Sequence, residues 1–176
     1  MDFGRAFDRV ASFLEDRGFP LALIGGLALH AYGISRATFD LDLVTERGAQ
    51  DPLISFLEAE GYETLHRSEG FSSHLARGPE ADRLDFVYVD PDTSRKLFAA
   101  CRPRLELGGR LALVPRPEHL VAMKVQAMKN DSRRALQDMA DVQELLRLPG
   151  VDLEEARGYF TRAGLHEEFD AIRKRL

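Results

Sequence analysis

The chain of 176 residues contains one cysteine, Cys101, and this excludes an internal disulfide framework. We therefore expect a reducing, cytoplasmic environment. No apolar run approaches the length that spans a bilayer, and the first ten residues lack the apolar core of a signal peptide. These absences argue against a secreted disulfide-rich protein and against a membrane protein.

The sequence also lacks the spacings that mark several kinds of catalytic site. Its five histidines are scattered, with no H-x-x-x-H pair and no Cys/His cluster, so a zinc site is not expected. No G-x-S-x-G motif or Ser/His/Asp arrangement is evident. The apolar (44%) and charged (30%) fractions are ordinary and suit one core with a helical appendage.

The formal net charge of −5 argues against a protein that coats nucleic acid, but the basic residues are unevenly distributed. Between Arg95 and Arg134, ten basic residues accompany three acidic ones. The ten are Arg95, Lys96, Arg102, Arg104, Arg110, Arg116, Lys124, Lys129, Arg133 and Arg134. A basic face of this kind could receive a triphosphate or an RNA backbone, and a solvated surface explains it equally well.

Residues 21–44 carry the most informative pattern. An apolar strand over Leu21–Ile24 is followed by Gly25 and Gly26 and by a helical turn over Leu27–Tyr32. Glycine lacks a Cβ, so this turn can direct backbone N–H groups and a helix N-terminus at one point. The pattern predicts a phosphate-binding turn.

A second strand then carries Asp40 and Asp42 two positions apart. Side chains alternate between the faces of a strand, so the two carboxylates project together. Like charges this close repel one another unless a cation lies between them, and carboxylate oxygens suit Mg²⁺. The pair predicts a magnesium site.

Asp85 is the acidic residue of a later apolar strand, Arg83–Val89. A buried carboxylate costs free energy unless it is paired or binds a metal, so Asp85 is the natural third ligand. The alternative is that Asp85 lies at the solvated end of its strand and pairs with Arg83 or another arginine.

The glycine pair followed by Arg36-x-Thr38-x-Asp40-Leu41-Asp42 resembles the signature of the DNA-polymerase-beta-like nucleotidyltransferase superfamily, and most closely its AbiEii/AbiGii toxin branch. Lys124 matches a lysine that this branch carries in a helix after the strands, and Asp138 and Asp141 match its D-x-x-D motif. Gln137 departs from the family, which has a basic residue there. The D-x-x-D pair could also be a salt-bridged helix surface involving Arg134 or Lys129.

The resemblance implies transfer of a nucleoside monophosphate from a nucleoside triphosphate (EC 2.7.7.-) with two Mg²⁺ ions. It assigns catalysis and metal binding to Asp40, Asp42 and Asp85. It assigns nucleotide binding to seven residues: Gly25, Gly26, Arg36, Thr38, Lys124, Asp138 and Asp141.

We expect an α+β fold, with a nucleotidyltransferase-like mixed β-sheet flanked by helices and followed by a C-terminal helical subdomain. The boundary falls in a proline-rich stretch, giving a core over 1–115 and helices over 116–176. Apolar spacing predicts helices over 2–17, 50–60, 93–100, 118–129, 133–147, 152–163 and 166–176. Further strands are expected over 62–66, 71–76, 83–89, 105–107 and 110–114.

Three functions remain open at this level. The first is a toxin-like enzyme that modifies tRNA or a protein and is held in check by a cognate antitoxin protein. The second is transfer to a small acceptor, as in enzymes that adenylylate antibiotics. The third is a nucleotide-binding module without turnover. The family-like motifs favour the first, while the acidic net charge favours a small cationic acceptor.

Overall fold

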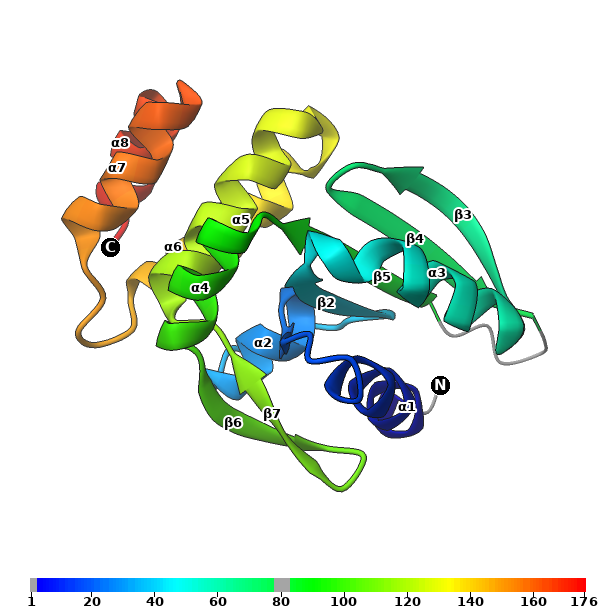
Figure 1. Cartoon of the computed structure of the whole chain (residues 1–176). Helices are drawn as coiled ribbons and strands as arrows, with labels where there is room; N and C mark the ends of the chain where they lie inside the picture. Colours follow the sequence, from blue (N-terminus) through cyan, green and yellow to red (C-terminus); the bar gives the residue numbers. More distant parts are fainter. Residues whose placement is uncertain (1–2, 78–82) are drawn as a thin grey trace. The chain divides into compact units, whose positions relative to one another are not determined.

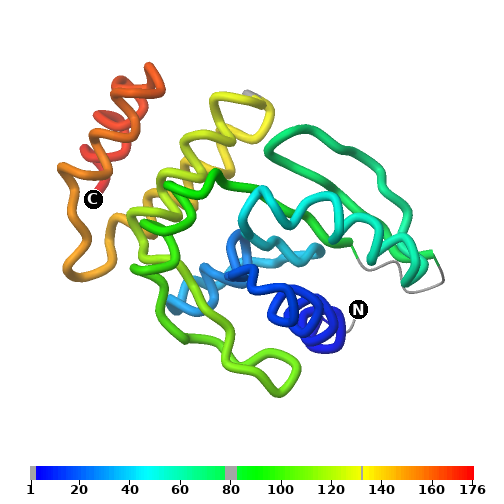
Figure 2. The backbone as a smooth tube through the Cα atoms, viewed as in Figure 1, coloured from blue at the N-terminus to red at the C-terminus, as the bar shows by residue number. Residues whose placement is uncertain are grey.

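The computed structural model describes residues 3–77 and 83–176 (Figure 1). Contacts between Cα atoms divide the chain into two compact units, Met1–Pro115 and Arg116–Leu176. The first unit combines a mixed β-sheet with helices. The second unit is helical, and the tube in Figure 2 coils along most of its length.

The sheet of the first unit has five strands in the order β1-β2-β5-β4-β3. The strands are β1 (Leu21–Leu23), β2 (Asp40–Glu46), β3 (Tyr62–Ser68), β4 (Phe71–Ala76) and β5 (Arg83–Val89). Strands β2 and β5 are parallel, and every other neighbouring pair is antiparallel. The sheet is therefore mixed, with its one parallel pair next to the edge strand β1.

Alternation along β2 and β5 gives this sheet two different faces. Leu41 and Leu43 of β2 and Leu84 and Phe86 of β5 are buried on one face. Helices α1 (Phe3–Glu15) and α3 (Gln50–Ala59) lie against this face (Figure 1). Ala6 and Val10 of α1 and Leu57 of α3 line a small pocket together with Leu84. Phe13 and Phe56 stack at 4.1 Å between ring centroids and join the two helices. The opposite face carries the acidic residues.

Three smaller elements complete the first unit. Helix α2 (Gly25–Ala31) follows β1 directly, and η1 (Arg47–Ala49) links β2 to α3. Helix α4 (Pro91–Ala100) begins at Asp90, whose Oδ1 accepts hydrogen bonds from the backbone N–H groups of Asp92 and Thr93, both at 3.0 Å.

The hairpin of β6 (Arg102–Leu107) and β7 (Arg110–Val114) turns at Gly108 and Gly109, which have φ of +62° and +76°. Arg110 ties the hairpin to α1 through Asp8 (2.6 Å) and Glu15 (2.8 Å).

The second unit consists of α5 (Pro117–Asn130), η2 (Ser132–Arg134), α6 (Ala135–Leu146), α7 (Leu153–Ala163) and α8 (His166–Arg173). Helix α5 packs against α6 and α7. Phe160 and Phe169, both fully buried, join α7 to α8 with ring centroids 5.4 Å apart. An apolar interior of its own therefore holds this unit together.

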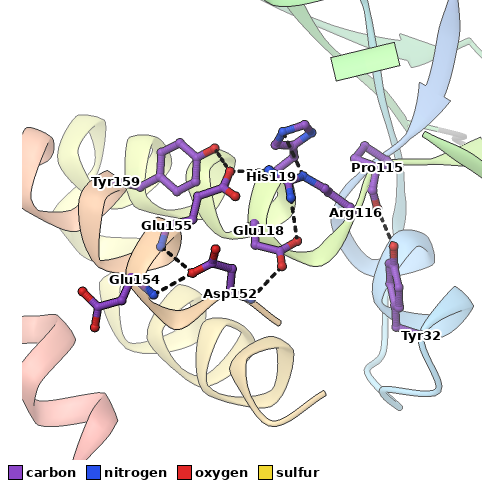
Figure 3. A network of polar contacts seen from close by, with 9 residues as sticks. All are labelled: Tyr32, Pro115, Arg116, Glu118, His119, Asp152, Glu154, Glu155 and Tyr159. Atoms are coloured by element: carbon purple, nitrogen blue, oxygen red, sulfur yellow. Dashed lines mark hydrogen bonds and ion pairs between the residues drawn. The ribbon is translucent and has the colours of Figure 1, made fainter. Parts of the chain in front are cut away.

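A polar network links the first turns of α5 and α7 (Figure 3). Arg116 donates to Glu155, which also accepts from Tyr159 Oη at 2.7 Å. Glu118 Oε1 accepts from the backbone N–H of Asp152 at 2.8 Å, and burial together with the charge of Arg116 lowers the pKa of His119. Within the first unit, Tyr32 Oη donates to the carbonyl of Pro115 at 2.7 Å.

The expected fold class and all of the expected helices and strands are confirmed, with shifts at their ends. Helix α2 begins at Gly25, so the two glycines lie inside it rather than before it. The first residue of the helix expected over 2–17 lies outside the described residues. Within residues 3–77 and 83–176, no helix has both the length and the apolar character that crossing a membrane requires.

Candidate active site

The parallel pairing of β2 with β5 brings the acidic residues together. Asp42 lies opposite Asp85, and Asp40 lies opposite Arg83, in the register of the two strands. Directly opposed residues project from the same face of a sheet, so these four side chains form two adjacent rows. Oxygen atoms of Asp40, Asp42 and Asp85 all lie within 4.8 Å of one another.

The donor set of this cluster fits a divalent cation. Three carboxylates meet at one point, and the Asp85 residue is only 5% exposed. Such a group is electrostatically unfavourable without a positive charge, and hard oxygen ligands are those that Mg²⁺ prefers. The three residues could therefore hold Mg²⁺.

Thr38 sets the position of the first carboxylate. Its Oγ1 lies 3.0 Å from Asp40 Oδ1 and 3.1 Å from the Asp40 carbonyl oxygen, and both are acceptors for the hydroxyl proton. The threonine of the R-x-T-x-D pattern thus contacts the aspartate two residues later.

The glycine pair is required by the close approach of these same side chains. A Cβ on Gly25 would lie 1.8 Å from Asp42 Oδ2, and the φ of Gly25 is +59°. A Cβ on Gly26 would lie 2.6 Å from Cβ of Thr38. Real Cβ atoms do not approach other atoms this closely, so both positions need glycine to admit Asp42 and Thr38. The sequence suggested a phosphate-binding turn, and this second reason for the glycines was missed.

Arg83 is the positive charge of the cluster. Its Nε donates to Asp85 Oδ1 at 3.0 Å, and this hydrogen bond and the nearby carboxylates raise the pKa of Arg83. The arginine pairing offered as the alternative for Asp85 therefore occurs together with the carboxylate cluster. The R-x-D spacing on one strand was the sequence signal for it.

The remaining predicted site residues belong to other segments of the chain. Arg36 is half-buried after α2, and its carbonyl accepts from His30 Nε2. Lys124, Asp138 and Asp141 gather in the helical unit, where Lys124 Nζ lies 2.9 Å from Asp138 Oδ1 and 2.6 Å from Asp141 Oδ2. All three are buried. This cluster joins α5 to α6, and its assignment to nucleotide binding stays a prediction.

No protein-family model matches the chain, and no curated protein sequence matches it. Solved structures do. The antibiotic-resistance factor ANT(2'')-Ia has a TM-score of 0.57 at 16% identity, with 99% of this chain and 91% of that one covered. The lincosamide antibiotic adenylyltransferase LnuA, bound to lincomycin, has a TM-score of 0.52 at 14% identity, covering 81% and 96%. A CCA-adding enzyme in complex with CTP has a TM-score of 0.51 at 16% identity, covering 97% and 46%. At these identities the likeness shows the fold, which is nucleotidyltransferase-like.

Proposed function

We propose that the protein is a Mg²⁺-dependent nucleotidyltransferase that moves a nucleoside monophosphate from a nucleoside triphosphate to an acceptor hydroxyl. The observation that carries the proposal is the meeting of Asp40, Asp42 and Asp85 on one face of a nucleotidyltransferase-like sheet. Exposed acidic groups are common on proteins, but here Asp85 is buried and Gly25 makes room for Asp42.

Each residue has a distinct part in this reaction. Asp40, Asp42 and Asp85 would hold Mg²⁺, which when bound lowers the pKa of an acceptor hydroxyl and neutralises charge on the leaving pyrophosphate. Thr38 fixes the Asp40 carboxylate, and Arg83 fixes that of Asp85. In this proposal, the Asp85 carboxylate accepts the proton that leaves the acceptor hydroxyl. The N–H groups of Gly25 and Gly26, with Arg36, would orient the triphosphate.

Substitution of Asp42 by asparagine tests the proposal. Asp42→Asn should lower the transfer rate by about 10³-fold or more, because the bound metal contributes several kcal/mol of charge stabilisation in the transition state. Asp51→Asn, which removes an exposed carboxylate from α3, is the matched control and should keep the wild-type rate. Transfer of label from an α-labelled triphosphate measures both. Asp42→Asn transfer at the wild-type rate would sink the assignment, and EDTA should stop wild-type transfer.

The family-like motifs suggest a macromolecular acceptor, either tRNA or a protein, and a toxin restrained by an antitoxin. Lys124, Asp138 and Asp141 belong to this hypothesis as nucleotide-binding residues. If the acceptor is tRNA, this hypothesis requires the basic segment between Arg95 and Arg134 to bind the RNA backbone.

A small-molecule acceptor is the second candidate. The contacts that the basic side chains between Arg95 and Arg134 make within the protein favour it. Six of the ten lie in ion pairs with acidic residues: Arg95, Arg110, Arg116, Lys124, Arg133 and Arg134. Arg102 donates to the carbonyls of Ala99 and Cys101, and Arg104 lies over the Tyr32 ring at 4.5 Å. The six ion pairs leave fewer cations to neutralise an RNA backbone.

One labelling experiment separates the two acceptors. The protein is incubated with Mg²⁺ and each α-labelled triphosphate, once with total tRNA and once with a panel of aminoglycosides and lincosamides. Label in tRNA would support the macromolecular acceptor, and label in a small compound would support the second candidate. Asp42→Asn serves as the inactive control in both arms.

A further inference from the structure

Arg83 lies next to the three carboxylates of the cluster, although metal binding alone does not require an arginine there. In the register of β2 and β5, Asp40 faces Arg83 and Asp42 faces Asp85, so three corners are acidic and the fourth is basic. The Nε atom of Arg83 lies 3.0 Å from Asp85 Oδ1. The guanidinium therefore belongs to the cluster as much as the carboxylates do.

The two partners of this ion pair differ in exposure. The Asp85 side chain is 7% exposed, whereas that of Arg83 is 46% exposed. Among the described residues, Arg83 makes no side-chain hydrogen bond other than that to Asp85. Burying a carboxylate is unfavourable unless a charge compensates it, and Arg83 supplies that charge to the most buried of the three.

Accepting the proposed function, we propose that Arg83 is a positioning residue and the built-in counter-ion of the metal site. It holds the Asp85 carboxylate in place and reduces the formal charge of the three ionised carboxylates by one unit. Arg83 therefore weakens the attraction of the site for a free metal ion, while it keeps Asp85 oriented for transfer. Removal of the arginine should move these two properties in opposite directions.

The first measurement is binding of Mn²⁺, as a spectroscopic substitute for Mg²⁺, to the whole protein without nucleotide. Electron paramagnetic resonance of free Mn²⁺ gives the dissociation constant. Arg83→Gln should tighten binding roughly five- to tenfold, because a unit positive charge next to a divalent ion is lost. Arg83→Lys keeps the charge and should stay within about twofold of wild type.

The second measurement is the transfer rate at saturating Mg²⁺ and triphosphate. Arg83→Gln should lower kcat by about tenfold or more, since a misplaced catalytic group costs up to about 10²-fold. Arg83→Lys should also lower kcat, because it loses the Nε donor. Tighter metal binding together with slower transfer distinguishes this role from a structural one, which would weaken both.

Arg47→Gln is the matched control for charge. It removes a positive charge from the same unit, but from an exposed pair with Glu69 beyond the other end of β2. Arg47 is about 20 Å along the strand from the carboxylate cluster, well beyond the screening length of about 8 Å. Arg47→Gln should therefore change neither the Mn²⁺ affinity nor kcat.

The outcomes separate this inference from the proposed function. Mn²⁺ binding by Asp42→Asn as tight as in wild type would overturn the metal site itself. Weakened binding by Asp42→Asn with unchanged or weaker binding by Arg83→Gln would overturn the role of Arg83 alone. If Arg83→Gln does not fold, Arg83→Lys decides. A Mn²⁺ affinity within twofold of wild type with a lower kcat supports the inference, and a tenfold change in affinity or an unchanged kcat overturns it.

Discussion

At the scale of single residues, the space around Gly25 is the tightest constraint on the site. The Asp42 carboxylate fills the position that a Cβ would take, and the backbone there has a positive φ. Gly33, a few residues later, also has a positive φ, +80°, but a Cβ there would meet nothing within 4 Å. A side chain at Gly25 would therefore cause both backbone strain and a steric conflict with Asp42, whereas a side chain at Gly33 would cause backbone strain alone.

Gly25→Ala should abolish most transfer by displacing Asp42, and should also destabilise the fold by about 1–3 kcal/mol through backbone strain. Gly33→Ala should show only the strain, about 1–2 kcal/mol, with wild-type transfer. Urea unfolding and the labelled-transfer assay measure the two effects. Equal activity of the two variants would contradict the close approach of Asp42.

At the scale of elements, buried ionic and polar clusters join neighbouring helices and strands. Lys124 of α5 sits between Asp138 and Asp141 of α6, with Arg134 Nε 3.8 Å from Asp138 Oδ2. In the sheet, His74 of β4 is fully buried and hydrogen-bonds to Ser72 (2.8 Å) and Thr64 (3.2 Å). A change of charge in either cluster should therefore change the free energy of unfolding.

Lys124→Ala should lower the free energy of unfolding by about 3–5 kcal/mol, because it removes the ammonium group that lies between two buried carboxylates. Lys129→Ala, exposed on the same helix, should change it by less than about 0.5 kcal/mol. Urea unfolding measures both. The resemblance adds a second expectation for Lys124→Ala, a higher KM for the triphosphate at a temperature where the variant is folded. An unchanged KM would leave Lys124 a structural role only.

Burial lowers the pKa of His74 from 6.5, and the attraction of the Asp85 and Glu58 carboxylates opposes this more weakly. The unfolded chain therefore binds the proton more readily than the folded one. Stability should fall as the pH drops below about 6.5, by at most about 1.4 kcal/mol per pH unit for this group, until the folded pKa is passed. Urea unfolding at pH 7.5, 6.5 and 5.5 measures the slope.

His74→Gln should reduce that slope, and His119, whose pKa burial also lowers, should account for part of what is left. His66→Gln removes an exposed histidine from the neighbouring strand β3 and should keep the wild-type slope. An identical slope in wild type and His74→Gln would show that His74 is not responsible.

At the scale of the whole molecule, the net charge of −5 and the pairing of the basic side chains point the same way. Six of the ten cations between Arg95 and Arg134 lie beside acidic partners within their own unit. A continuous electrostatic surface for a nucleic-acid backbone is therefore not expected from this segment.

Binding of labelled total tRNA should accordingly be weak and depend little on salt. We expect affinity to fall by less than about tenfold between 50 and 200 mM salt, as for one or two phosphate contacts. Fluorescence anisotropy at the two salt concentrations measures this. A loss of 10³-fold or more, typical of six or more contacts, would restore tRNA as the favoured acceptor.

The amino-acid sequence by itself determined the elements and the residue types of the site. Apolar periodicity located the helices and strands, and strand alternation placed Asp40 and Asp42 on one side of β2, because both depend only on nearby residues. The strands expected over 105–107 and 110–114 likewise followed from a local pattern, and the turn between them contains Gly108 and Gly109, which have positive φ angles.

Only the tertiary structure decided which distant groups meet. Asp85 lies opposite Asp42 because β5, about forty residues later, pairs with β2 in one particular register. The same pairing places Arg83 beside Asp40, and the return of β2 past α2 explains why Gly25 must be glycine. Ion pairs such as Arg110 with Asp8 neutralise charges that looked available in the sequence. Charge and side-chain volume are properties of one residue, but their consequences depend on the neighbours that folding supplies.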